Sequence, residues 1–316
     1  MGAYVTPPSL EGRGKGLAHA PTDRDYIVIT PDQPLKPAPA ILTTPAAMRR
    51  WRASHPGTLG LVPTMGYLHE GHLDLVRQAR EENRHVVVSI FVNPTQFGPG
   101  EDFEKYPRDE VRDLNLLREA EVDAVYLPSA VDMYPAGFQT YVNVEEVTKP
   151  LEGSARPGHF RGVTTVVLKL FNAAGPDRAY FGKKDAQQLR VIQRMVRDLD
   201  LGVEIVPCEI IREADGVAMS SRNVYLSPEE RAAAPVLKRA LDHARALWAG
   251  GSRDAEALRR SVRELIEAEP LARIDYISLA DDESLVEIDG AAGERALLSL
   301  VVKFGRTRLL DNVELR

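Results

Sequence analysis

A strand pattern changes to a helix pattern within the segment Leu61-Val62-Pro63-Thr64-Met65-Gly66-Tyr67-Leu68-His69-Glu70-Gly71-His72. Residues 58–62 predict a strand, and we expect Pro63 to end it because proline has no backbone N–H. From Leu73 onward, the spacing of the apolar side chains predicts a helix over 73–83. The two histidines of the segment therefore stand where a strand leads into a helix.

This junction is suited to binding phosphate. Ligands of an open α/β sheet bind at the carboxyl ends of its strands, and a helix start offers free N–H groups and the positive end of a dipole. Gly66 and Gly71 let the backbone approach a ligand closely, and two nearby imidazoles can donate to the same phosphate oxygens. A metal pair is the alternative reading of His69 and His72. The zinc-protease motif spaces its histidines one position further apart, however, and no third ligand lies close in sequence.

Strand and helix patterns alternate on both sides of this segment. Continuous apolar runs such as 85–92 are typical of parallel strands that are covered on both faces. We therefore predict an α/β fold with a Rossmann-like, doubly wound parallel sheet. The predicted strands are 58–62, 85–92, 122–127, 178–181 and 203–207, and the predicted helices are 45–54, 73–83, 109–120, 163–172 and 187–199.

The pattern changes near Ile211. Ser227-Pro228-Glu229-Glu230 is a capping box with a first-turn proline, and it predicts a helix that runs to about residue 248. We expect a helix over 254–267 and strands over 274–279, 296–303 and 306–310. The predicted division is a proline-rich N-terminal extension (1–44), a Rossmann-like domain (45–210) and a smaller α+β C-terminal domain (211–316).

Composition narrows the class of protein. Lys plus Arg is 40 and Asp plus Glu is 46, so the net charge is −6. This charge argues against nucleic acid as a main partner, because binding it requires cations that neutralise phosphates. The single cysteine fits a reducing compartment, and no apolar run approaches the roughly 20 residues that span a bilayer. We expect a cytoplasmic protein without a membrane partner.

Four loops are expected to meet at strand ends or at the domain junction: Met65–His72, Asn93–Phe97, Gly182–Asp185 and Met219–Arg222. His69, His72, Lys184 and Arg222 could surround a triphosphate. The sequence has no Walker loop, so it does not belong to the P-loop enzymes. Preorganised cations of this kind would stabilise charge during attack at the α-phosphate. Gln96 and Gln188 are neutral amides suited to a second substrate. The segment 156–162 is interpreted as a mobile functional loop.

These motifs resemble those of the pantothenate synthetase (pantoate–β-alanine ligase) family, in the nucleotidyltransferase superfamily with a histidine (HxGH) signature. The resemblance covers roughly residues 45–316, and its specific segments are 63–72, 91–97, 156–163, 181–189 and 212–226. It implies a two-step reaction with Mg²⁺. The carboxylate of pantoate attacks the α-phosphate of ATP to give pantoyl adenylate and pyrophosphate, and the amine of β-alanine then displaces AMP. It also implies a homodimer.

The resemblance assigns roles to individual residues. His72, as proton donor, His69 and Lys184 would be catalytic, Gln96 and Gln188 would bind pantoate, and Asp113 would lie near the metal and phosphates. ATP would be bound by Met65, Gly66, Tyr67, Leu68, His69, Glu70, Gly71, His72, Gly182, Lys183, Lys184, Asp185, Ile211, Met219, Ser220, Ser221 and Arg222, the last four forming a lid.

Two positions depart from the family. The family usually has Glu at the position of Lys183 and a bulky apolar residue at Thr95. If residues 181–184 are extended, alternate side chains point to opposite faces, so Lys184 would face the phosphates and Lys183 would point away.

Two rival functions remain. One is another adenylyl- or cytidylyltransferase that uses the same histidine loop with a different acceptor. The other is a catalytically silent nucleotide-binding protein, which Lys183 suggests but His69, His72 and Lys184 argue against.

Overall fold

The computed structural model describes residues 36–316, so positions 1–35 of the predicted extension lie outside the described residues. The predicted extension also included Ala40–Leu42, and this part of the prediction is wrong. These residues form β1, an edge strand of the large sheet that pairs with β4. The three residues follow directly after Pro37 and Pro39 and show no hydrophobic period of their own, so the sequence did not indicate a strand.

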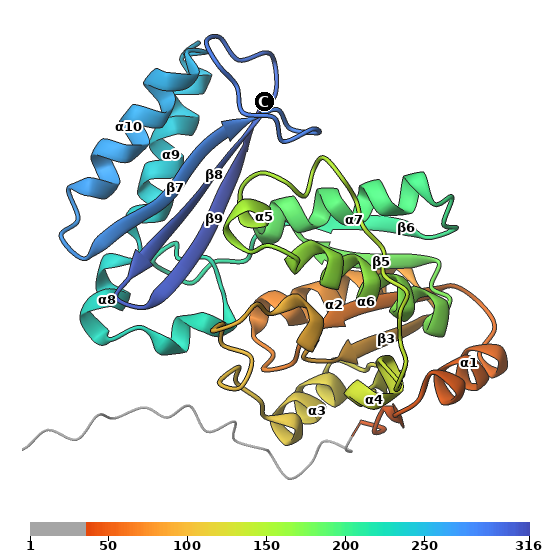
Figure 1. Ribbon diagram of the computed structural model, residues 1–316. Coiled ribbons are helices and arrows are strands. Elements are labelled where there is room, and N and C mark those ends of the chain that lie inside the picture. The colour runs from red at the N-terminus through yellow and green to blue at the C-terminus, as the bar shows by residue number, and fades with distance from the viewer. Residues whose placement is uncertain (1–35) are drawn as a thin grey trace, which may run out of the picture. The chain divides into compact units, whose positions relative to one another are not determined.

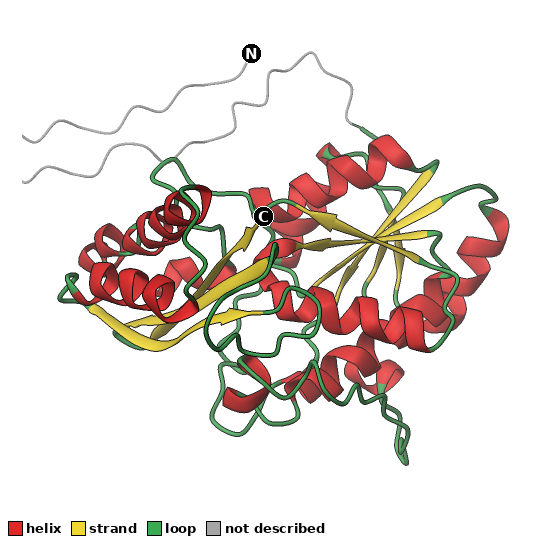
Figure 2. Ribbon diagram, turned by 90° about the horizontal axis from the view of Figure 1, so that it is seen from above, coloured by secondary structure: helices red, strands yellow, loops and turns green. Residues whose placement is uncertain are grey.

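The large sheet confirms the predicted parallel α/β class. Its order is β1-β4-β3-β2-β5-β6, and all of its recorded pairings are parallel. Figure 2 shows these strands fanning out between helices. The strands after β1 are β2 (Leu59–Thr64), β3 (His85–Ile90), β4 (Ala124–Tyr126), β5 (Arg178–Gly182) and β6 (Glu204–Cys208).

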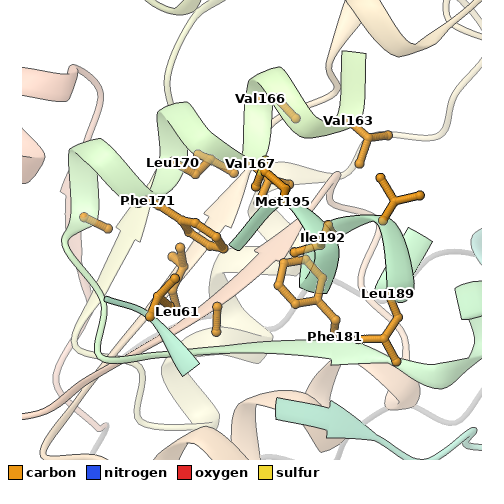
Figure 3. Close-up of a cluster of buried hydrophobic side chains, with 14 of the residues drawn as sticks. Leu61, Val163, Val166, Val167, Leu170, Phe171, Phe181, Leu189, Ile192 and Met195 are labelled. Carbon is orange, nitrogen blue, oxygen red and sulfur yellow. The ribbon is translucent and has the colours of Figure 1, made fainter. Parts of the chain in front are cut away.

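Helices cover both faces of this sheet because its central strands are apolar on both sides. Leu61 and Val87 pack with α1, α6 and α7, whereas Val62 and Val88 pack with α2 and α3. Figure 3 shows part of the first cluster, which joins Leu61 of β2 with Phe171 of α6 and Ile192 of α7. The helices of this part are α1 (Pro45–Ser54), α2 (Glu70–Glu82), α3 (Glu110–Glu119), α4 (Ala130–Met133), α5 (Glu152–Ala155), α6 (His159–Ala174) and α7 (Ala186–Asp198), and the 3₁₀ turns are η1 (Pro94–Gln96) and η2 (Lys183–Asp185).

The strand–helix junction differs from its prediction at both ends. β2 continues through Pro63 to Thr64, so the expected end at residue 62 is wrong. Pro63 is tolerated because β5 pairs only with Gly60 and Leu61, and the ladder on that side has already ended. Helix α2 begins at Glu70 instead of residue 73, with His69 as its N-cap. His72 therefore lies in the first turn of the helix.

The prediction that the segment 156–162 is a loop is wrong for its second half. Helix α6 begins at His159, and the side chains of His159 and Phe160 are buried. A Cβ at Gly162 would lie 2.4 Å from the carbonyl oxygen of Thr95, so glycine allows α6 to approach η1 closely. The N-terminal half of the segment is a turn, and the rest is a packed helix.

The C-terminal part has its own three-stranded antiparallel sheet, β7-β8-β9, with α9 and α10 against it (Figure 1). The helix predicted from 227 to 248 is interrupted, because Pro235 cannot donate to the preceding turn. The elements are α8 (Pro228–Ala233), α9 (Val236–Ala249), α10 (Ala255–Glu267), β7 (Ala272–Ala280), β8 (Ala296–Phe304) and β9 (Thr307–Leu315), after the turn η3 (Ser221–Tyr225). Within residues 36–316, no helix has both the length and the apolar character needed to cross a bilayer.

Candidate active site

The two histidines of the strand–helix junction form one stacked pair. Their ring centroids lie 4.0 Å apart, and the backbone N–H of His69 donates to Nδ1 of His72 at 3.3 Å. Because Nδ1 of His72 accepts this bond, the neutral ring carries its proton on Nε2. In His69, the buried Nδ1 makes no hydrogen bond to any described residue. Both rings line a cavity at the carboxyl end of β2.

The environment keeps both rings neutral. Burial, with a further contribution from the positive charge of Lys184, lowers the pKa of His69 to about 4. Burial, together with His69 and Lys184, lowers the pKa of His72 to about 3. At neutral pH both side chains are therefore hydrogen-bond donors without a net charge. An anion that binds against them would raise both pKa values and favour the charged form.

Gln96 is fixed from two sides at the same cavity. Its side-chain oxygen accepts from Nδ2 of Asn93 at 2.9 Å, and its NH₂ group donates to Sδ of Met65 at 3.5 Å, which leaves one N–H for a ligand in the cavity. Its backbone carbonyl lies 2.8 Å from Nδ1 of His159, whose pKa is lowered to about 4 by burial and by Arg156. Arg156 in turn donates to both carboxylate oxygens of Glu101, at 2.9 and 2.6 Å.

The two lysines of η2 have different surroundings. Lys183 forms ion pairs with Glu209 and with Glu314, the latter at 3.6 Å. The ammonium of Lys184 lies 3.7 Å from Asp185, and Lys184 lines the cavity. The segment is a 3₁₀ turn, so the premise of an extended backbone is wrong. Lys183 itself lines neither cavity, although its partner Glu209 lines the smaller one. Asn312 of β9 fixes the turn by donating to the carbonyls of both lysines.

The lid segment reaches the same cavity from the C-terminal side. Arg222 donates through Nε and Nη2 to the two oxygens of Asp102, at 2.9 and 3.1 Å, and its guanidinium lies over the ring of Tyr106. Burial alone would raise the pKa of Asp102, but the hydrogen bonds and charge of Arg222 bring it below its usual value. Ser221 donates to the carbonyl of Tyr67 at 3.4 Å, so the lid contacts the histidine loop directly.

The cavity has a volume of about 250 Å³ and gathers most of the predicted site residues. The predicted residues that line it are Met65, His69, Gly71, His72, Gln96, Gly182, Lys184, Asp185, Gln188, Ile211, Met219, Ser220, Ser221 and Arg222. A second cavity of about 720 Å³ adjoins it toward the C-terminal sheet. The walls shared by the two cavities include Arg156, Lys184, Gln188 and Arg222.

Several predicted residues do not line either cavity. They are Gly66, Tyr67, Leu68, Glu70, Lys183 and Asp113. Leu68 is a core residue, Glu70 pairs with Arg77 on the surface of α2, and Asp113 accepts hydrogen bonds from the backbone of the histidine loop.

Sequence reasoning did not assign site roles to Asn93, Tyr106, Arg156 or His159. Asn93 and Arg156 lie in the sequence motifs 91–97 and 156–163, so the sequence indicates their position near the site but not their contacts. Tyr106 and its neighbour Asp102 lie in a segment without a periodic pattern, and nothing in their sequence indicates that they contact Arg222.

Known proteins resemble this chain over nearly all of its described length. A family model described as pantoate-beta-alanine ligase matches residues 40–314. A pantothenate synthetase of Roseiflexus sp. (strain RS-1) is 60% identical over 272 residues, which are 86% of this chain and 98% of that protein. A pantothenate synthetase of Heliobacterium modesticaldum is 59% identical over 267 residues, covering 84% of this chain and 95% of that one.

Solved structures agree with this result. Pantothenate synthetase from Thermus thermophilus superposes with a TM-score of 0.82 at 49% identity, covering 87% of this chain and 98% of that one. A pantoate-beta-alanine ligase from Francisella tularensis, complexed with beta-gamma ATP and beta-alanine, has a TM-score of 0.72 at 33% identity. The match covers 87% of this chain and 97% of that one. The family model spans both the large-sheet part and the C-terminal part of the fold, including the residues of the histidine cavity. The chain therefore belongs to the pantoate-beta-alanine ligase family.

Proposed function

We propose that this chain condenses pantoate with β-alanine in an ATP-dependent reaction that forms pantothenate, AMP and pyrophosphate. The observation that carries the proposal is one cavity in which neutral histidines, Lys184 and Arg222 stand beside the amides of Gln96 and Gln188. Cationic and N–H donors suit a triphosphate, and neutral amides suit a hydroxy acid. The names of the relatives, and the ATP and β-alanine of the Francisella protein, support the same assignment.

The first step is adenylation. A carboxylate oxygen of pantoate attacks the α-phosphorus of ATP, and the bond from this phosphorus to the pyrophosphate oxygen breaks. Nε2–H of His72, His69 and Lys184 stabilise the charge that grows on the phosphate oxygens. Gln96 and Gln188 orient pantoate so that its carboxylate is in line with the bond that breaks.

The second step forms the amide. The β-alanine amine attacks the acyl carbon of pantoyl adenylate, the bond from this carbon to the AMP oxygen breaks, and the amine loses a proton. We expect the lid residues Met219–Arg222, with Ile211, Gly182, Lys184 and Asp185, to surround the nucleotide during both steps, because they line the cavity. Water is excluded from the reactive adenylate when these residues close over it.

Mg²⁺ fits this site as a partner of the phosphates. Described residues 36–316 contain no group of three metal-ligating side chains, and Asp185 is a carboxylate in the cavity wall. A Mg²⁺ ion typically keeps waters and is held by one or two carboxylates plus substrate phosphates, which suits this arrangement. Bound there, the ion would neutralise charge on the triphosphate.

We further propose a cytoplasmic homodimer. The buried free thiol of Cys208 is compatible with a reducing compartment. A surface groove lined by Val131, Tyr134, Phe138 and Tyr141 exposes apolar side chains, which a second subunit could cover.

The decisive experiment measures exchange of labelled pyrophosphate into ATP. We expect exchange to require pantoate and Mg²⁺ and to proceed without β-alanine, because the adenylate forms before the amine reacts. Exchange that needs β-alanine would contradict the adenylate mechanism. Exchange driven by a mononucleotide or an unrelated acid would instead favour another nucleotidyltransferase, and absence of exchange with every acid would favour a silent nucleotide-binding protein.

A further inference from the structure

Asp113 of α3 has a carboxylate that is almost completely buried, with 1% of its surface exposed. One oxygen accepts the backbone N–H of Tyr67 at 2.6 Å, and the other accepts the N–H of Leu68 at 2.8 Å. The carboxylate thus binds two successive N–H groups of the histidine loop, which is the geometry of a backbone anion nest.

The loop needs this support because its backbone conformation is strained. Tyr67 has φ of 51°, which is unfavourable for a residue with a Cβ, and Gly66 has φ of 80°. A Cβ at Gly66 would lie 3.1 Å from the Asp113 carboxylate and 2.9 Å from Ile90. Such a conformation persists only where the surroundings enforce it.

This loop also sets the position of the histidine pair. Leu68 is followed directly by His69, the N-cap of α2, whose backbone N–H donates to His72. A shift of Tyr67 and Leu68 would therefore be transmitted to the atoms that hold both imidazoles.

We propose that Asp113 is a positioning residue that holds the histidine loop in its reactive geometry, and that it is not a metal ligand. The inference rests on the proposed function for the role of the histidines, but its evidence is the loop itself. The carboxylate lies outside the walls of both cavities, and each of its oxygens already accepts a backbone N–H.

The test is Asp113→Asn, with Asp109→Asn as its matched control. The introduced amide would place an NH₂ group against a backbone donor, so the loop must move. Asp109 is exposed at the start of the same helix and accepts the N–H of Arg112 as an N-cap, a role that asparagine also fills. We expect Asp113→Asn to lower kcat of pyrophosphate exchange by about 10- to 100-fold, the scale for a small misplacement of reacting groups. Asp109→Asn should stay near the wild-type rate.

The dependence on Mg²⁺ separates positioning from metal binding. A positioning residue leaves the Mg²⁺ concentration for half-maximal exchange unchanged while kcat falls. A rise of about tenfold or more in that concentration would overturn the proposal in favour of a metal ligand. A lower melting temperature with unchanged kcat per folded molecule would also overturn it, in favour of a purely structural role.

A double-mutant cycle with Gly66→Ala adds a second test. The new Cβ disturbs the same loop from the opposite side of the contact, so the two substitutions should be strongly non-additive in kcat. If the losses in kcat were additive, the two substitutions would not act through the same loop, and the proposal would be contradicted.

One readout does not depend on activity. Ring ¹⁵N resonances of His69 and His72 in the free protein should shift in Asp113→Asn and not in Asp109→Asn. If the wild type shows no pantoate-dependent exchange but these resonances shift, the proposed function fails and the positioning role stands. Unchanged resonances in Asp113→Asn would refute the positioning role alone.

Discussion

At the scale of single residues, Lys183 and Lys184 show how neighbours in sequence acquire different roles. Lys183, which lines neither cavity, pairs with Glu314 and with Glu209, and Glu209 lies in the wall of the smaller cavity. Lys184 lines both cavities, and its charge contributes to the low pKa values of His69 and His72. Lys184 is half-buried and has Asp185 as its anionic partner in the free protein, and a triphosphate would add further anionic oxygens beside it.

We expect Lys184→Ala to lower kcat/KM for ATP by at least about 100-fold, the scale for removing one charge-stabilising donor. Lys183→Gln should change it by less than about tenfold, because a partly exposed ion pair contributes roughly 0–1 kcal/mol. The two variants are compared in pyrophosphate exchange at fixed ionic strength. Equal losses would mean that Lys183 also acts on the phosphates.

His72→Ala tests whether the imidazole of His72 acts as a donor or only packs in the fold. It removes the Nε2–H donor, so we expect the adenylation rate to fall by about 10²- to 10³-fold. The fold should be retained, since the side chain keeps some contact with solvent at the cavity. The rate is measured in single-turnover experiments and the melting temperature by calorimetry. A large loss of stability with a near-normal rate would show that the ring serves packing instead.

The residues that sequence reasoning could find are those close to one another along the chain. His69, His72, Lys184 and Arg222 stand in compact motifs, and the structure brings them to one cavity. The contact of Asp113 with Tyr67, 46 positions earlier, exists only in three dimensions, so the sequence could not indicate it.

At the scale of elements, the lid and the segment 98–107 are joined across the cavity. Arg222 binds Asp102 through one edge of its guanidinium and leaves Nη1 without a bond to that carboxylate. Tyr225 adds a hydrogen bond to the carbonyl of Lys105 at 2.9 Å. The carboxylate thus orients Arg222 with a free edge for phosphate, because five N–H donors on a planar group can serve two anions.

Asp102→Asn should therefore weaken ATP binding. We expect KM for ATP to rise by about three- to tenfold while kcat changes less, since orienting one partly exposed pair is worth roughly 1 kcal/mol. Glu104→Gln is the control, because it removes an exposed carboxylate from the same segment. A lower KM in Asp102→Asn would show that Asp102 competes with the nucleotide for Arg222.

Most long periodic elements were predicted within a few residues, although the strand over 306–310 ends before the second half of β9. Among the short elements, β4 was predicted over 122–127, but β1, α4 and α5 were not. The helix over 254–267 and the strand over 296–303 differ from α10 and β8 by one residue at an end. β1, α4 and α5 have three or four residues each, which is less than one clear hydrophobic period. The break at Pro235 could have been read from the proline itself.

At the scale of the whole molecule, three histidines of the cavity wall make stability depend on pH. Besides His69 and His72, His159 has its pKa lowered to about 4, first by burial and then by Arg156, while Glu101 and Glu152 act in the opposite direction. A lowered histidine pKa means that the unfolded chain binds a proton more readily than the folded one. The free energy of unfolding is then unaffected by His159 above the pKa of about 6.5 that this residue has in the unfolded chain. It decreases as the pH falls from there toward about 4, the pKa of His159 in the folded protein.

His159→Asn isolates this effect, because asparagine keeps a donor near the carbonyl of Gln96 but cannot be protonated. With a pKa of about 4 in the folded protein and about 6.5 in the unfolded chain, His159 should lower the free energy of unfolding by about 2 kcal/mol when the pH falls from about 7 to about 5. Urea unfolding at the two pH values should therefore show a decline in the wild type that is about 2 kcal/mol larger than in His159→Asn. His243→Asn serves as the control, since His243 is exposed on α9 and its replacement should leave the wild-type decline intact. If His159→Asn declines as steeply as the wild type, His159 is already protonated in the folded protein, and Arg156 would then have to turn away from it toward Glu101.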